Sequence, residues 1–256
     1  MLIMIAVLLI TSVLSGGVPV PSRDLQKLAA AARTADLRGD WDGLMRAHDA
    51  IAARPATADH RAWIEYYLGY VDWRQSSLAF MGQGMPAVSA CLRNAQEHLT
   101  RALDLAPAFT EARLLLVIVD GGVMNADSTR VAELGPRLGA NVKQVVAEAP
   151  ANPRVKYLQA FLGYYIPNRT RDQKDTALAD WRRAAESFPG KPPANEPAWG
   201  RAEAWAWLGG TLLTDGKPSE AKAALERALA DRPDFWWARQ IALPQASRMQ
   251  SAHLKQ

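Results

Sequence analysis

The sequence predicts an all-α protein, an α-solenoid of about five irregular helix pairs followed by a C-terminal capping helix. The 256-residue chain is rich in Ala, Leu, Arg and Glu, which favour helices, and poor in Val and Ile after its first 20 residues. Prolines end amphipathic segments at roughly regular points, namely Pro55, Pro107, Pro150, Pro189 and Pro233. The pair Leu-Gly recurs in phase with them, at Leu68-Gly69, Leu162-Gly163 and Leu208-Gly209. A glycine inside a helix costs about 1 kcal/mol relative to alanine, so this recurrence indicates a closely passing neighbouring helix.

The N-terminal segment is uncharged through Val20 and strongly apolar through Leu14. Small residues follow it, which predicts that residues 1–17 are a secretory signal peptide. An uncleaved membrane anchor formed by residues 1–20 is the alternative, because about 20 apolar residues can span a bilayer. We therefore expect an exported protein in the periplasm of a bacterium, or one held at the membrane by this segment.

The predicted superhelix covers residues 22–243 and contains all five helix pairs. The first pair covers 24–37 and 40–53, where Gly39 ends one helix and Asp40 caps the next. The second pair covers 59–80 and 85–105.

The third pair is expected at 110–119 and 129–148, with 120–122 ending its first helix and Gly135-Pro136 kinking its second. The fourth pair is expected at 152–165 and 172–187. Residues 189–200 contain four prolines and are predicted to form a loop.

The fifth pair carries the clearest pattern in the chain. Its key residues are Trp205, Leu208, Gly209, Leu212, Ala221, Leu225, Ala228 and Pro233. A closing helix is expected to begin at Asp234 and to end at Pro244, which leaves 244–256 as a C-terminal tail.

By these residues the chain resembles the tetratricopeptide repeat family, whose unit is a pair of antiparallel helices. The likeness covers nearly all of the chain after residue 22, although the three middle units carry insertions and Leu212 replaces an expected Tyr. The resemblance implies a right-handed superhelix whose concave face, lined by the first helices, holds a peptide or another protein. Sel1-like repeats are the nearest alternative, with similar consequences.

The sequence offers no specific catalytic, metal or cofactor motif. The net charge of +4 is spread along the chain, which does not indicate nucleic-acid binding. No histidine lies at helical ligand spacing from another, so we expect no zinc site; the four are His48, His60, His98 and His253. No nucleophile elbow or phosphate-binding loop is present either. We therefore expect a protein that is not an enzyme and has no cofactor.

Aromatic residues provide the best functional indication. Trp63, Tyr66, Tyr70 and Trp73 are spaced by three, four and three residues and so form one stripe along a helix. On the resemblance this stripe lies on the concave side, with Arg74 at its end. The predicted binding residues are Trp63, Tyr66, Tyr70, Trp73, Arg74, Tyr157 and Tyr164. The alternative is that these rings fill gaps between repeats, the reading we favour for Trp205 and Trp181.

Three functions remain open at this point. The first is a non-enzymatic scaffold that binds a protein or peptide in the cell envelope through an aromatic groove. The second is a periplasmic protein that binds a small, partly apolar ligand and serves a transporter. The third is an enzyme whose site has no recognisable motif. A membrane contact is expected only if the N-terminal segment is retained.

Overall fold

The structure is a computed structural model of the whole chain. It describes residue 18 and residues 20–55, 58–165, 168–193 and 196–253, so the predicted signal peptide at residues 1–17 lies outside the described residues. The described part contains α-helices and no strand. None of the helices within it has the length and apolar character that crossing a membrane would require.

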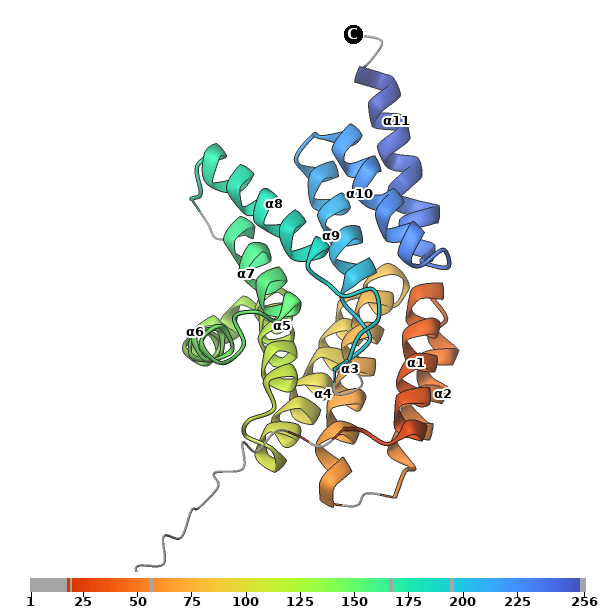
Figure 1. Cartoon of the computed structure of the whole chain (residues 1–256), viewed down its shortest axis with the longest axis vertical. Coiled ribbons are helices and arrows are strands. Elements are labelled where there is room, and N and C mark those ends of the chain that lie inside the picture. Colours follow the sequence, from red (N-terminus) through yellow and green to blue (C-terminus); the bar gives the residue numbers. More distant parts are fainter. Residues whose placement is uncertain (1–17, 19, 56–57, 166–167, 194–195, 254–256) are drawn as a thin grey trace, which may run out of the picture.

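Ten of the helices form five consecutive pairs whose members pack against each other, which confirms the predicted helical-repeat fold (Figure 1). The pairs are α1 (Arg23–Arg38) with α2 (Trp41–Ala52), α3 (Ala58–Gly82) with α4 (Met85–Leu105), α5 (Thr110–Ala126) with α6 (Val131–Glu148), α7 (Pro153–Tyr165) with α8 (Arg171–Glu186), and α9 (Arg201–Thr214) with α10 (Pro218–Asp231). The described residues between α8 and α9 are not helical, as expected for this proline-rich stretch.

Local signals set the helix ends. Gly39 adopts a left-handed conformation with φ +67° and ends α1, and the Asp40 side chain accepts a hydrogen bond from the Gly43 amide to begin α2. Thr170 and Gln173 form a reciprocal capping box at the start of α8.

Two predicted helix ends were wrong. Helix α5 continues through residues 120–122 to Ala126. Gly122 lies against α4 there, and a Cβ at this position would come within 3.1 Å of Leu92 Cδ2, so packing outweighs the low helix propensity of glycine.

The closing helix also continues through Pro244, where we expected it to end. A π-helical turn at Trp237–Ala242 leads directly into α11 (Leu243–His253). A π turn shifts the backbone hydrogen-bond partners by one residue, which accommodates a proline that has no N–H to donate. Much of the predicted tail is therefore helical.

The recurrent Leu-Gly pairs lie where helices of a pair approach each other. A Cβ on Gly69 would come within 2.8 Å of Leu99 Cγ, and one on Gly209 within 2.6 Å of Leu225 Cγ. A Cβ on Gly163 would lie 3.6 Å from the nearest side chain of α8, an ordinary contact. The close approach predicted from the sequence is thus confirmed for two of the three glycines.

The superhelix curls until its fifth pair meets its first (Figure 1). Leu37 of α1 belongs to the same cluster of buried side chains as the core of the last two pairs. Gly39 lies against the Trp236 indole, and Arg33 of α1 forms an ion pair with Glu203 of α9 at 3.0 Å. This contact encloses the inner face of the superhelix.

Candidate functional site on the inner face

The aromatic stripe of α3 is part of the core. Trp63 is 1 % exposed and Tyr66 is fully buried. Both rings pack on Phe109, just before α5, with ring centroids 4.5 and 5.3 Å away. These two side chains therefore join the second pair to the third. Further along α3, Tyr70 is buried and Trp73 is half-buried.

The chain itself covers the other end of this stripe. The segment between α8 and α9 crosses the inner face (Figure 1). Trp199 of this segment lies near Tyr70 and Trp73, with centroid distances of 6.3 and 5.7 Å. Its Nε1–H also donates a hydrogen bond of 2.7 Å to the Tyr66 hydroxyl. Trp199 thus occupies the place that an aromatic side chain of a ligand would take in an open groove.

Arg154 of α7 holds the segment from the opposite side. It is 2 % exposed, and its guanidinium donates to the backbone carbonyls of Pro197 and Trp199. The same group donates to the carboxylates of Glu111 and Glu196, each at 3.1 Å. A buried cation is stabilised only when its donors are satisfied, and four acceptors achieve this here.

Two buried ion pairs lie beside Tyr70. Arg74, a predicted binding residue, is buried and lies 2.9 Å from Asp36 of α1, so its charge is paired within the protein. Arg33 binds Glu203 through two hydrogen bonds, of 3.0 and 3.1 Å. Burial raises the pKa of the Asp36 carboxyl, with Arg74 opposing it. These pairs connect α1 to α3 and to α9.

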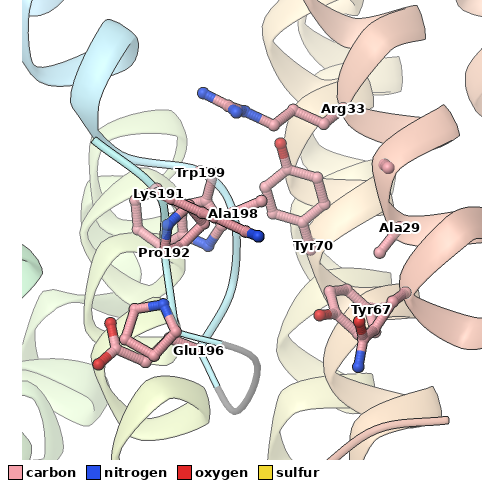
Figure 2. A pocket seen from close by; sticks show the side chains of 12 residues that line it. Ala29, Arg33, Tyr67, Tyr70, Lys191, Pro192, Glu196, Ala198 and Trp199 are labelled. Carbon is pink, nitrogen blue, oxygen red and sulfur yellow. The ribbon is translucent and has the colours of Figure 1, made fainter. Parts of the chain in front are cut away.

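A cavity of about 360 Å³ opens between α1, α3 and the inserted segment (Figure 2). Helix α3 contributes Tyr67 and Tyr70 to its wall, and Arg33 comes from α1. The segment contributes Lys191 and Trp199. Of the predicted binding residues, Tyr70 is the one that lines this cavity. Its hydroxyl is buried and has no hydrogen-bond partner among the residues that the structure describes.

The two predicted binding residues of the fourth pair lie apart from the cavity. Tyr157 is half-buried and packs against Trp181 at a centroid distance of 5.5 Å. The Tyr164 hydroxyl donates to Asp215, at the end of α9, over 3.3 Å. Both pack in the core of the last two pairs. The α3 stripe belongs to a separate core, which is formed by the first three pairs together with part of α7.

Sequence reasoning missed the residues that complete the inner face. Arg33 and Trp199 line the cavity with α3, and Arg154 holds the segment that carries Trp199, but their sequence separations reveal no pattern. The one usable signal was the density of prolines between residues 189 and 200, which predicted a loop but not its position.

Neither the comparison with models of known protein families nor the search of curated proteins finds a match to this chain.

Proposed function

We propose that the protein is a non-enzymatic, exported scaffold of the tetratricopeptide type that binds a segment of another protein on its inner face in the cell envelope. One observation carries this proposal: the inner face already holds a non-helical segment of the chain itself. Bonds from Arg154 to the carbonyls of Pro197 and Trp199 recognise backbone, whatever the side chain. Aromatic rings on α3 supply the apolar contact. The same chemistry suits an extended segment of a partner.

The cavity beside the segment is the place where such a partner would enter. It is lined by rings from two sides and by the charged side chains of Arg33, Lys191 and Glu196, so it offers both apolar and polar contact. A side chain of a bound segment could occupy the cavity while its backbone lies beside Lys191 and Ala198, which line the cavity. A rigid, preformed wall lowers the ordering cost of such binding.

Site-specific photo-crosslinking in the intact cell tests this proposal. A photoreactive residue replaces Ala30 or Ala198, two exposed positions that line the cavity. The matched control replaces Ala230, which is exposed on α10. We expect a discrete adduct at the two cavity positions, identified by mass spectrometry, and none at Ala230. Identical adducts at all three positions, or none at the cavity, would contradict the proposal.

The second candidate is binding of a small, partly apolar ligand, and the Tyr70 hydroxyl favours it. A buried hydroxyl without a partner costs free energy, which a polar group of a ligand could recover. The cavity volume also reaches the lower end of small-molecule sites, about 300 Å³. Native mass spectrometry of the purified protein should then show a bound mass that is lost on denaturation and reduced in Tyr70→Phe.

Export is tested separately. N-terminal sequencing of the protein from fractionated cells should locate it outside the cytoplasm and show whether the segment 1–17 has been removed. A full-length protein in the cytoplasm would contradict this part of the proposal.

A further inference from the structure

Two histidines far apart in the sequence meet around a buried carboxylate, away from the cavity. His48 lies on α2, Asp72 on α3 and His98 on α4, so three neighbouring helices each supply one side chain. One ligand atom from each residue lies within 4.8 Å of the other two. The His48 Nε2–Asp72 Oδ1 distance is 3.7 Å, and the His98 Nε2–Asp72 Oδ2 distance is 3.8 Å.

These distances fit ligands around an ion better than hydrogen-bonded partners. A hydrogen bond between a nitrogen and an oxygen spans about 2.7–3.2 Å. Ligands held about 2.0–2.1 Å from a tetrahedral zinc ion lie roughly 3.3 Å from one another. Small rotations of the two imidazoles would bring the three atoms from their present spacing to that value.

Asp72 is the observation that points to a cation. Its side chain is aimed between the two imidazoles and is 3 % exposed, and its Oδ2 atom has no hydrogen-bond partner. Within the described part of the chain, its ion-pair contacts are with His48 and His98. A buried carboxylate with unsatisfied oxygens is costly unless a cation compensates it.

The surroundings of His98 orient its ring for metal binding. Glu65 Oε2 lies 2.7 Å from His98 Nδ1, and Arg101 Nη2 lies 2.8 Å from the same nitrogen while Arg101 Nε donates to Glu65 at 3.0 Å. His98 Nε2 faces Asp72. A metal ion on Nε2 would place the hydrogen on Nδ1, and because a carboxylate only accepts, Nδ1 would then donate to Glu65. A carboxylate behind a histidine ligand is the usual outer shell of a zinc site.

His48 also turns its Nε2 toward Asp72. Its Nδ1 lies 3.7 Å from the carboxylate of the exposed Asp49, which is too far for a hydrogen bond. Both histidines are partly exposed, so a metal ion can reach the cluster from solvent. The ring centroids are 6.1 Å apart and nearly perpendicular, which leaves room between the two nitrogens.

We propose that His48, Asp72 and His98 bind a zinc ion, with water as the fourth ligand. Two imidazoles and a carboxylate are a ligand set that zinc accepts, and three protein ligands leave one position open. The ion would join α2, α3 and α4 and so fix the junction of the first two helix pairs. The proposal does not depend on the function of the inner face.

Zinc binding to the tag-free protein tests this inference. After treatment with a chelator and its removal, zinc is titrated in a calorimeter, and metal content is measured by mass spectrometry. We expect one zinc ion per chain and a higher melting temperature in its presence. Cobalt at the same site should give visible absorption bands typical of four-coordinate geometry.

Variants assign the ligands. His48→Ala and His98→Ala should each weaken zinc binding by more than about 100-fold, because loss of an outer-shell partner alone costs about 10–100-fold. Glu65→Gln should fall in that smaller range. Asp42→Asn, an exposed carboxylate on α2, is the matched control and should bind zinc as the unchanged protein does.

Asp72→Asn keeps the test decisive if a histidine variant misfolds. It removes the uncompensated charge without changing the shape of the side chain, so the metal-free protein should melt no lower than the unchanged one. The rise in melting temperature with zinc should nevertheless be lost. Absence of stoichiometric zinc in the unchanged protein, or unchanged affinity in the ligand variants, would overturn the proposal.

Discussion

Glycine occupies equivalent places in three first helices, but the packing around it differs from one to the next. Gly69 and Gly209 lie under a leucine and a backbone carbonyl of the paired helix, at distances that no Cβ tolerates without movement. At Gly163 a Cβ would meet only the Ala177 Cβ, at an ordinary contact distance of 3.6 Å. The requirement for glycine therefore depends on how closely each pair approaches.

Alanine substitutions at these positions measure that difference. Gly69→Ala and Gly209→Ala should lower the free energy of unfolding by about 1–3 kcal/mol, because the added methyl forces Leu99 or Leu225 and the facing backbone apart. Gly163→Ala should be neutral or stabilise by up to about 1 kcal/mol, since alanine favours the helix. Urea unfolding at 25 °C checks all three. An equal loss at Gly163 would show that its pair is closer than the structure has it.

The same residues show how far the sequence could be interpreted. The Leu-Gly pairs in phase with the prolines predicted two close helix contacts, those of Gly69 and Gly209, because two helices that approach closely need a glycine at the point of contact. The meeting of His48, Asp72 and His98 leaves none, since 24 and 26 residues separate them and each lies on a different helix. The expectation of no zinc site rested on the spacing of the histidines along the chain, and that spacing does not determine their positions in space.

At the scale of elements, the segment between α8 and α9 acts as an additional inner layer. Its non-helical character was predictable, because four prolines cannot continue a helix. Its position was not, because it depends on Arg154 and on the rings of α3, which are distant in sequence. Trp199 is the side chain through which this segment contacts Tyr66, Tyr70 and Trp73.

Two substitutions of Trp199 separate its packing from its hydrogen bond. Trp199→Phe keeps most of the ring contact but leaves the buried Tyr66 hydroxyl without its donor, which should cost about 1–3 kcal/mol. Trp199→Ala also opens a cavity and should cost about 3–5 kcal/mol. In addition, hydrogen exchange of the backbone amides in residues 187–193 and 196–200 should accelerate, and the increase should be largest in the alanine variant.

Pro193→Ala is the control for that experiment, because Pro193 is exposed in the same segment. It should leave both the stability and the exchange rates nearly unchanged. If Trp199→Ala behaves like this control, the segment is not anchored on the inner face in solution.

At the scale of the whole molecule, contact between the first and fifth pairs turns an open superhelix into an enclosed one. The turn after α1 meets the start of the closing helix, where Gly39 faces Trp236 and Arg38 lies 3.5 Å from Asp234. The resemblance to open repeat proteins predicted the pairs and their order. It did not predict closure, which depends on contacts between residues distant in sequence, such as Gly39 with Trp236 and Arg33 with Glu203.

Gly39→Ala tests closure, with Gly216→Ala as a matched control. Both glycines have positive φ, +67° and +72°, so alanine is strained by about 1–2 kcal/mol at either position. A Cβ on Gly39 would also collide with the Trp236 indole, whereas Gly216 has no neighbouring atom within 4 Å. Gly39→Ala should therefore be the more destabilising in urea unfolding. Equal losses would show that the ends do not meet.

Glu203 gives closure a dependence on pH. Burial alone would raise the pKa of this carboxyl, but the charge and hydrogen bonds of Arg33, together with the Gly200 amide, lower it from 4.5 to about 2. Because the folded pKa lies below the unfolded one, Glu203 contributes stability that is fully present above about pH 4.5. That contribution is lost as the pH falls toward 2. By linkage, its size at neutral pH is on the order of 3 kcal/mol.

Glu203→Gln should remove this dependence while keeping an acceptor for the Gly200 amide at the start of α9. At pH 7 the variant should be less stable, because Arg33 loses its buried carboxylate. Between pH 4.5 and 2 its urea midpoint should fall less steeply than that of the unchanged protein. Other carboxylates titrate in both proteins, so the difference between the two curves isolates Glu203.

Glu220→Gln, at an exposed carboxylate on α10, should reproduce the pH dependence of the unchanged protein. Parallel curves for Glu203→Gln and the unchanged protein would show that the ion pair between the first and last pairs is not formed.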